Sequence, residues 1–207
     1  MIKISTSILS SKNRIDTIKK LNDTPTDYIH IDVMDGYFVT NKQFQIDEIN
    51  SLLPQSKKPI DIHLMVENPE KYIKELNNPI IEYITFHLET KQNINNLITL
   101  IKNKGYKVGI AIKPNTNINK IYKYIDKIDM ILIMSVEPGY GGQTFINKTY
   151  KKINTLKKKN NNITIEVDGG INDTNIEKLK NNIDIAVIGS YIINKDDYKK
   201  TIIELKK

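Results

Sequence analysis

Apolar residues follow two patterns that alternate along the chain. Short runs rich in isoleucine and valine predict buried strands, and the polar stretches between them carry apolar residues at every third or fourth position, which predicts amphipathic helices. The predicted strands cover residues 2–9, 28–33, 59–66, 79–87, 106–112, 128–136, 163–167 and 185–188. The predicted helices cover residues 11–21, 46–53, 69–76, 93–104, 118–125, 149–159, 175–180 and 198–205, with a short helical turn at 191–193 and an exposed turn at 160–162.

This alternation predicts a (β/α)8 TIM barrel, an α/β fold, formed as one domain over residues 1–207. No linker rich in glycine, serine or proline divides the sequence. An open, doubly wound sheet is the alternative. Polar residues that could take part in catalysis or binding lie at nearly every predicted strand end. An open sheet would concentrate such residues at one switch point, so the barrel is favoured.

Composition narrows the function classes. The chain has 39% hydrophobic and 27% charged residues, which is ordinary for a globular protein. Its net charge of +7 resides largely in lysine runs at 151–152, 157–159 and 206–207, which we expect on solvated helix faces. An RNA-binding protein would need basic residues interleaved with exposed aromatics, and the tyrosines form no such stripe. We therefore expect no nucleic-acid partner.

The cysteine count and the apolar runs bear on location. The chain has no cysteine, which excludes disulfides and thiol chemistry and permits a reducing compartment. The sequence leads directly into a strand pattern and has no apolar run long enough to cross a bilayer, so we expect no signal peptide and no membrane partner. A cytoplasmic protein is the expectation.

Titratable residues gather at the ends of three predicted strands. His30 and Asp32 share one face of a strand because side chains alternate, and His63 occupies a matching place on the next strand. Asp168 ends the seventh strand. A buried His–Asp pair within a core is the alternative for the first stretch alone, but two imidazoles and two carboxylates directed at one barrel mouth suit Zn²⁺, Fe²⁺, Mn²⁺ or Co²⁺. We predict one divalent metal per chain, bound by His30, Asp32, His63 and Asp168.

Two further residues near this face have structural interpretations. His87 ends the fourth predicted strand, where a packed histidine is favoured over one that supports a metal ligand. Glu166 should point inward below Asp168 and needs a buried partner, for which Lys113 is a candidate.

Glycine-rich turns follow the last three predicted strands. Gly169-Gly170, Gly189-Ser190 and the loop at 139–142 offer backbone N–H groups of the kind that bind anions, and glycines permit a loop to close. Gly189-Ser190 alone is equally compatible with a simple turn. Three such loops on successive strands indicate a phosphate site, with Ser7 a candidate at the mouth. Met34, Met65 and Met134 either fill the core or cap a charged intermediate.

Several motifs together resemble the ribulose-phosphate 3-epimerase family over essentially the whole chain. They are Ser7-Ile8-Leu9-Ser10, His30-Ile31-Asp32-Val33-Met34-Asp35-Gly36, His63-Leu64-Met65-Val66, Val136-Glu137-Pro138-Gly139-Tyr140-Gly141-Gly142-Gln143, Glu166-Val167-Asp168-Gly169-Gly170 and Gly189-Ser190. The chain departs from the family's usual pattern at Thr6 and Thr40, where proline is usual, and at Gln45-Ile46, where Gly-Pro is usual.

The resemblance implies a metal-dependent isomerase of pentose phosphate metabolism that interconverts D-ribulose 5-phosphate and D-xylulose 5-phosphate. It implies that Asp32 and Asp168 are the acid/base pair, working at C3 through an enediolate, with Asp32 taking the proton in the ribulose-to-xylulose direction. The residues implied to contact substrate are Ser7, His63, Gly139, Tyr140, Gly141, Gly142, Asp168, Gly169, Gly170, Gly189 and Ser190. A 3-epimerase of a six-carbon ketose 6-phosphate, such as allulose 6-phosphate, is the alternative. We expect a homo-oligomer.

Overall fold

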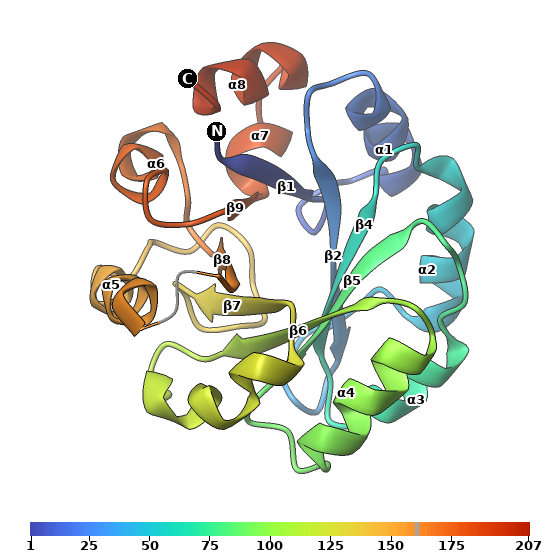
Figure 1. Cartoon of the computed structure of the whole chain (residues 1–207). Helices are drawn as coiled ribbons and strands as arrows, with labels where there is room; N and C mark the ends of the chain where they lie inside the picture. Colours follow the sequence, from blue (N-terminus) through green and yellow to red (C-terminus); the bar gives the residue numbers. More distant parts are fainter. Residues whose placement is uncertain (160–161) are drawn as a thin grey trace.

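The computed structural model describes residues 1–159 and 162–207, so the predicted turn at 160–162 falls largely outside the described residues. Within these residues, eight parallel strands follow one another around a ring that the pairing of the first strand with the second closes. Helices surround this ring on its outside (Figure 1). The predicted (β/α)8 TIM barrel is confirmed and the open sheet is excluded.

The strands are β1 (Lys3–Ser7), β2 (Tyr28–Asp35), β3 (Lys42–Gln43), β4 (Ile60–Met65), β5 (Ile81–His87), β6 (Lys107–Ile112), β7 (Met130–Met134), β8 (Thr164–Asp168) and β9 (Ile185–Ile188). The helices are α1 (Arg14–Asn22), α2 (Ile46–Leu52), η1 (Leu53–Gln55), α3 (Pro69–Glu75), α4 (Ile94–Asn103), η2 (Ile118–Lys127), α5 (Thr149–Lys159), α6 (Asp173–Leu179), α7 (Ser190–Ile193) and α8 (Tyr198–Leu205). The short strand β3 pairs antiparallel with the end of β2 and was not predicted.

Helix boundaries follow the local sequence in most places. Asn68 caps α3 by accepting a hydrogen bond from the Lys71 N–H, and Gly105 follows α4 with a φ of +83°. The helix predicted over residues 118–125 is present as a 3-10 helix over residues 118–127. The reason lies in the spacing of its buried residues, Ile118, Ile121 and Tyr124, because a helix of three residues per turn aligns every third side chain.

The two faces of the barrel strands have different chemistry. Ile29, Ile31 and Val33 of β2 are fully buried and belong to the main apolar cluster, where they pack under the helices. The alternate residues of β2 face the barrel interior. Tyr28, Tyr83, Met130 and Ile185 form a separate buried cluster near the start of their strands, so apolar packing closes that end of the interior. The polar residues lie toward the carboxyl ends of the strands, the end at which barrels of this type carry their sites.

No helix in residues 1–159 and 162–207 is both long and apolar enough to span a membrane.

Candidate active site and metal centre

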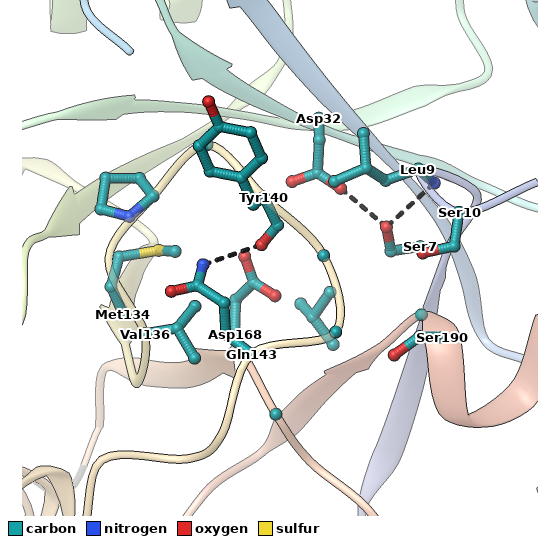
Figure 2. Close-up of a pocket in the computed structure, with 18 of the residues that line it drawn as sticks. Ser7, Leu9, Ser10, Asp32, Met134, Val136, Tyr140, Gln143, Asp168 and Ser190 are labelled. Atoms are coloured by element: carbon teal, nitrogen blue, oxygen red, sulfur yellow. Dashed lines mark hydrogen bonds between the residues drawn. The ribbon is translucent and has the colours of Figure 1, made fainter. Parts of the chain in front are cut away.

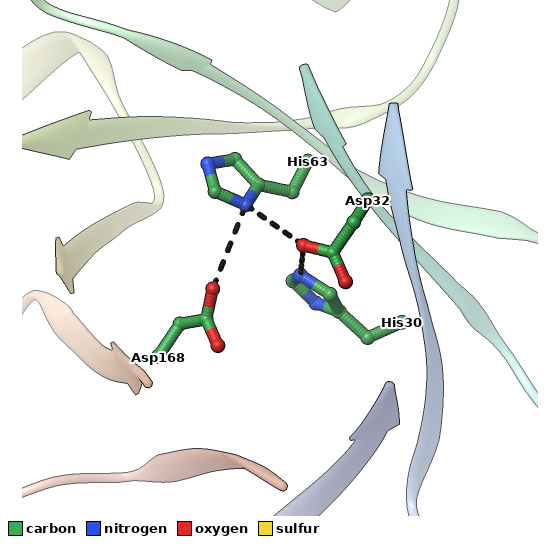
Figure 3. Close-up of side chains that lie close together, drawn as sticks. All are labelled: His30, Asp32, His63 and Asp168. Carbon is green, nitrogen blue, oxygen red and sulfur yellow. Dashed lines mark hydrogen bonds and ion pairs between the residues drawn. The ribbon is translucent and has the colours of Figure 1, made fainter. Parts of the chain in front are cut away.

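Four predicted ligand residues converge at the carboxyl ends of three strands (Figure 3). Asp32 of β2 lies level with His63 of β4 because the two strands pair in that register, and Asp168 is the last residue of β8. His30 and His63 are fully buried. One ligand atom from each of the four residues lies within 4.8 Å of the others. The barrel register thus brings together residues that are up to 138 positions apart in sequence.

The spacing of these atoms suits a divalent metal. Asp32 Oδ1 lies 3.2 Å from His30 Nε2 and 3.3 Å from His63 Nδ1, and Asp168 Oδ2 lies 3.8 Å from that same nitrogen of His63. Ligands placed about 2.1 Å from a tetrahedral ion are roughly 3.4 Å apart. His30 Nε2 is buried and makes no hydrogen bond within the described chain. Two imidazole nitrogens and two carboxylate oxygens fit Zn²⁺, Fe²⁺, Mn²⁺ or Co²⁺.

The remaining nitrogen of each ligand histidine is also engaged. His30 Nδ1 lies 2.6 Å from Asp61 Oδ2, which also accepts a hydrogen bond from the Ser5 hydroxyl. His63 Nε2 lies 2.9 Å from Nε2 of His87. His87 is buried, as expected of a packed strand-end histidine, and it also contacts the ligand residue His63, which was the alternative left open by the sequence.

Glu166 is fully buried, and its predicted pairing with Lys113 is wrong. Its carboxylate lies in a second cluster with His30 and Asp61, with one ligand atom of each residue within 4.8 Å of the others. The Lys113 ammonium instead lies 4.1 Å from the centre of the Phe38 ring. Burial, together with the charge of Asp61, raises the pKa of Glu166 well above its ordinary value.

The two aspartates of the cluster have opposite electrostatic environments. Burial and the charge of Asp32 raise the pKa of Asp168 to about 6. Burial opposes ionisation of Asp32 as well, but His30 and His63 outweigh it and hold the pKa of Asp32 well below its ordinary value. The Ser7 hydroxyl donates a 2.7 Å hydrogen bond to Asp32 Oδ2, which further favours its ionised form. Neighbouring carboxylates whose pKa values are pushed apart are suited to opposite acid–base roles.

A cavity adjoins this cluster, with Asp32 and Asp168 on its wall (Figure 2). Its walls include all but one of the residues predicted to contact substrate, and these are Ser7, Gly139, Tyr140, Gly141, Gly142, Asp168, Gly169, Gly170, Gly189 and Ser190. Met34, Met65 and Met134 also line it. Asp32 and Asp168 both reach the cavity, whereas His63 is fully buried beside it, so substrate contact by His63 stays a prediction.

Glycine is required by geometry in the turn after β8. Gly170 has a φ of +65°, and a Cβ there would lie 2.6 Å from the Gln143 carbonyl oxygen and from the Phe145 nitrogen. This turn therefore packs directly on the loop after β7. Ser135, directly after β7, links the loop after β7 to the turn after β8. Its hydroxyl lies 2.8 Å from the carbonyl oxygen of Asp168 and 2.6 Å from that of Gly169.

The loop after β7 also contacts the loop after β2. The Thr40 and Tyr140 hydroxyls lie 2.7 Å apart, and the Asn41 amide donates to the Gly139 carbonyl. The Gln143 amide donates to the carbonyls of Glu137 and Tyr140, which holds the glycine loop in a compact turn. Thr40 thus forms a hydrogen bond that links the two loops.

The barrel, the paired aspartates and the metal-capable cluster at the carboxyl ends of the strands define a (β/α)8-barrel enzyme. A family model described as the ribulose-phosphate 3 epimerase family matches residues 3–193. The chain belongs to the ribulose-phosphate 3-epimerase family, and it is an isomerase of the epimerase class.

Relatives support this assignment over nearly the whole chain. The ribulose-phosphate 3-epimerase of Bacillus subtilis is 35% identical, and the match covers 100% of this chain and 99% of that protein. The protein of the same name from Aquifex aeolicus is 36% identical over 87% of this chain and 83% of its own length. The one from Helicobacter pylori strain 26695 is 35% identical over 97% and 95%.

Solved structures show the same fold at low sequence identity. A 3-hexulose-6-phosphate synthase from Salmonella typhimurium has a TM-score of 0.70 at 15% identity, covering 99% of this chain and 96% of that one. A tryptophan synthase from Mycobacterium tuberculosis has a TM-score of 0.74 at 9% identity, covering 99% and 91%.

Proposed function

We propose that this enzyme interconverts D-ribulose 5-phosphate and D-xylulose 5-phosphate. The observation that carries the proposal is the placement of Asp32 and Asp168 on one cavity, with an oxygen of each in the same cluster as two imidazoles. Epimerisation next to a carbonyl requires one group to remove the C3 proton and another to return a proton to the opposite face. The two carboxylates approach from β2 and β8, which β1 and β9 separate in the barrel.

The environments of the aspartates suggest which one acts first. Asp32 is held ionised, so it is the base that takes the C3 proton in the ribulose-to-xylulose direction. Asp168, with a pKa raised to about 6, can carry a proton and deliver it to the other face. The roles exchange in the reverse direction. The Ser7 hydroxyl keeps Asp32 oriented through its second oxygen.

We assign the metal ligands to His30 Nε2, Asp32, His63 Nδ1 and Asp168. A divalent cation held there would supply positive charge that stabilises the oxygens of an enediolate and makes the C3 proton more acidic. The two histidines fix the cluster from the buried side, and the two aspartates complete it from the cavity side.

We assign the phosphate group to the turns after β8 and β9. Gly169 and Gly170 line the cavity beside Gly189 and Ser190, at the place where barrels commonly bind phosphate. The loop at 139–142 forms the facing wall and would exclude water when substrate is bound. Binding energy at this remote group would hold C3 between the aspartates.

The test is an epimerase assay on purified protein after metal removal and reconstitution with Zn²⁺ or Co²⁺, with metal content measured in parallel. D-Ribulose 5-phosphate should be the better substrate when it is compared with D-allulose 6-phosphate, the six-carbon alternative. His63→Ala should lose bound metal and turnover but keep its circular dichroism spectrum, because the ligands lie at strand ends outside the main apolar cluster. Full activity in thoroughly demetallated His63→Ala protein would contradict the metal assignment.

A further inference from the structure

Two side chains, the buried His87 and the partly buried Glu89, extend from His63 away from the metal-capable cluster. Nε2 of His63 lies 2.9 Å from Nε2 of His87, and Nδ1 of His87 lies 3.2 Å from Glu89 Oε2. His63 and His87 are almost completely buried. The series His63–His87–Glu89 therefore runs from β4 to the end of β5 and the residues just beyond it.

The hydrogen atoms in this series have one arrangement compatible with metal binding. His63 turns Nδ1 toward Asp32 and Asp168, so that nitrogen must be free of hydrogen when it binds a cation. A neutral imidazole then carries its hydrogen on Nε2, which must donate to His87. His87 can accept on Nε2 only if its own hydrogen resides on Nδ1, facing Glu89.

Glu89 is built to accept that hydrogen. Its other oxygen, Oε1, accepts hydrogen bonds from the Lys113 backbone N–H at 2.9 Å and from the Thr116 hydroxyl. Because a backbone N–H can only donate, Oε1 is committed as an acceptor, and Oε2 is left to face His87. The Phe38 ring packs on His87 with its centre 4.8 Å away, which shields the series on one side.

The second ligand histidine is supported differently. His30 directs Nδ1 to the Asp61 carboxylate at 2.6 Å, a direct contact with a charged acceptor. His63 reaches its carboxylate only through an intervening imidazole. The His87 ring places the Glu89 carboxylate one residue farther from the metal site than Asp61 is. The His87 ring still determines which nitrogen of His63 carries hydrogen.

We propose that His87 and Glu89 are positioning residues that hold His63 in the tautomer and orientation that binds metal through Nδ1. This inference rests on the proposed metal site and extends it by two residues that touch neither the cation nor the cavity wall. Partners that orient a metal ligand typically contribute about 10- to 100-fold in metal affinity.

The test compares two replacements of nearly equal size, His87→Gln and His87→Met, with metal affinity as the readout. Full-length apoprotein is titrated with Zn²⁺ against a chromophoric chelator, and thermal unfolding of each apoprotein controls for packing. His87→Met, which offers His63 only a weak sulfur acceptor, should bind Zn²⁺ about 10- to 100-fold more weakly. His87→Gln, whose side-chain oxygen can accept from His63, should recover most of the affinity. Equal affinities in both variants, either native-like or reduced, would overturn the proposal.

A third variant, Glu89→Gln, tests Glu89 without a change of shape. In Glu89→Gln the oxygen must still face the Lys113 N–H, so the amide NH₂ is directed at His87 and forces hydrogen onto its Nε2. That arrangement opposes donation by His63, and Zn²⁺ affinity should fall with the fold intact. Native affinity in Glu89→Gln would contradict the role of Glu89.

Nitrogen-15 spectra report the tautomers directly, and the chain has only three histidines to assign. In the Zn²⁺-loaded native protein, His87 should carry its hydrogen on Nδ1, the less common tautomer. Hydrogen on Nε2 of His87 would refute the arrangement even if the metal binds. Failure of the native protein to bind Zn²⁺ at all would instead refute the proposed metal site, so the two failures are distinguishable.

Discussion

Replacement of Gly170 by alanine tests whether the turn after β8 requires a residue without a side chain at this position. A Cβ at Gly170 would lie 2.6 Å from two backbone atoms of the loop after β7, and backbone cannot move aside as the end of a flexible side chain can. The positive φ adds about 1–2 kcal/mol of strain for a residue with a Cβ. Crowding in a well-packed region adds about 1–3 kcal/mol. We therefore expect Gly170→Ala to lower the free energy of unfolding by about 2–5 kcal/mol.

Gly105→Ala is the matched control. Gly105 also has a positive φ, +83°, but a Cβ there would have nothing within 4 Å in the described structure. It follows α4, outside the residues that line the cavity. This variant should show the strain alone, a loss of about 1–2 kcal/mol, with kcat and KM unchanged.

Equilibrium denaturation with urea gives the two free energies, and steady-state kinetics gives the effect on the site. Because the crowded turn forms part of the cavity wall, Gly170→Ala should also raise the KM for D-ribulose 5-phosphate. A Gly170→Ala protein no less stable than Gly105→Ala would show that the loop after β7 yields freely. The two segments would then not hold one another in place.

Three further outcomes follow from the site. In D₂O, the first product formed in either direction should carry deuterium at C3, because the two carboxylates exchange their protons with solvent between turnovers. Mass spectrometry of the product before back-reaction measures this label. Substantial retention of the original hydrogen would rule out the two-aspartate scheme. The kcat/KM for free D-ribulose should be lower than that for the 5-phosphate by a factor that corresponds to several kcal/mol of transition-state stabilisation, because binding energy at the remote phosphate positions C3. Comparable kcat/KM values for the two sugars would contradict the phosphate assignment. Thr40→Val removes the hydroxyl contact with Tyr140, so amide hydrogen exchange in residues 137–143 should become faster; unchanged exchange would mean that this contact does not restrain the loop.

The barrel and the metal ligands could be predicted from sequence because both depend on local patterns. Strand periodicity places His30 and Asp32 on one face, and a parallel barrel gathers all strand ends at one mouth. For His63 and Asp168 it was enough to know that both lie toward the carboxyl ends of their strands. These inferences require no information about register.

The supporting residues could not be predicted in the same way, because their roles depend on which residues on different strands lie level. The contact between His63 and His87 requires the register of β4 against β5, and the capture of Glu89 by the Lys113 N–H requires that of the next strand, β6. The partner of Glu166 was predicted wrongly for the same reason. Strand β3 escaped prediction because it is two residues long and lies in a polar loop.

The register between β4 and β5 contains a shift that explains how His87 reaches the interior. Ile60 pairs with Ile81, but Asp61 pairs with Tyr83, so one residue of β5, Glu82, is passed over. A one-residue slip exchanges the two faces of a strand. Beyond the shift, Thr85 and then His87 therefore face inward as Asp61 and His63 do, while Ile84 and Phe86 join the apolar cluster under the helices. Without the shift, the side chains of Ile84 and Phe86 would point into the polar end of the barrel. The irregularity in β5 thus accounts at once for a continuous apolar layer outside the barrel and for a second imidazole behind His63 inside it.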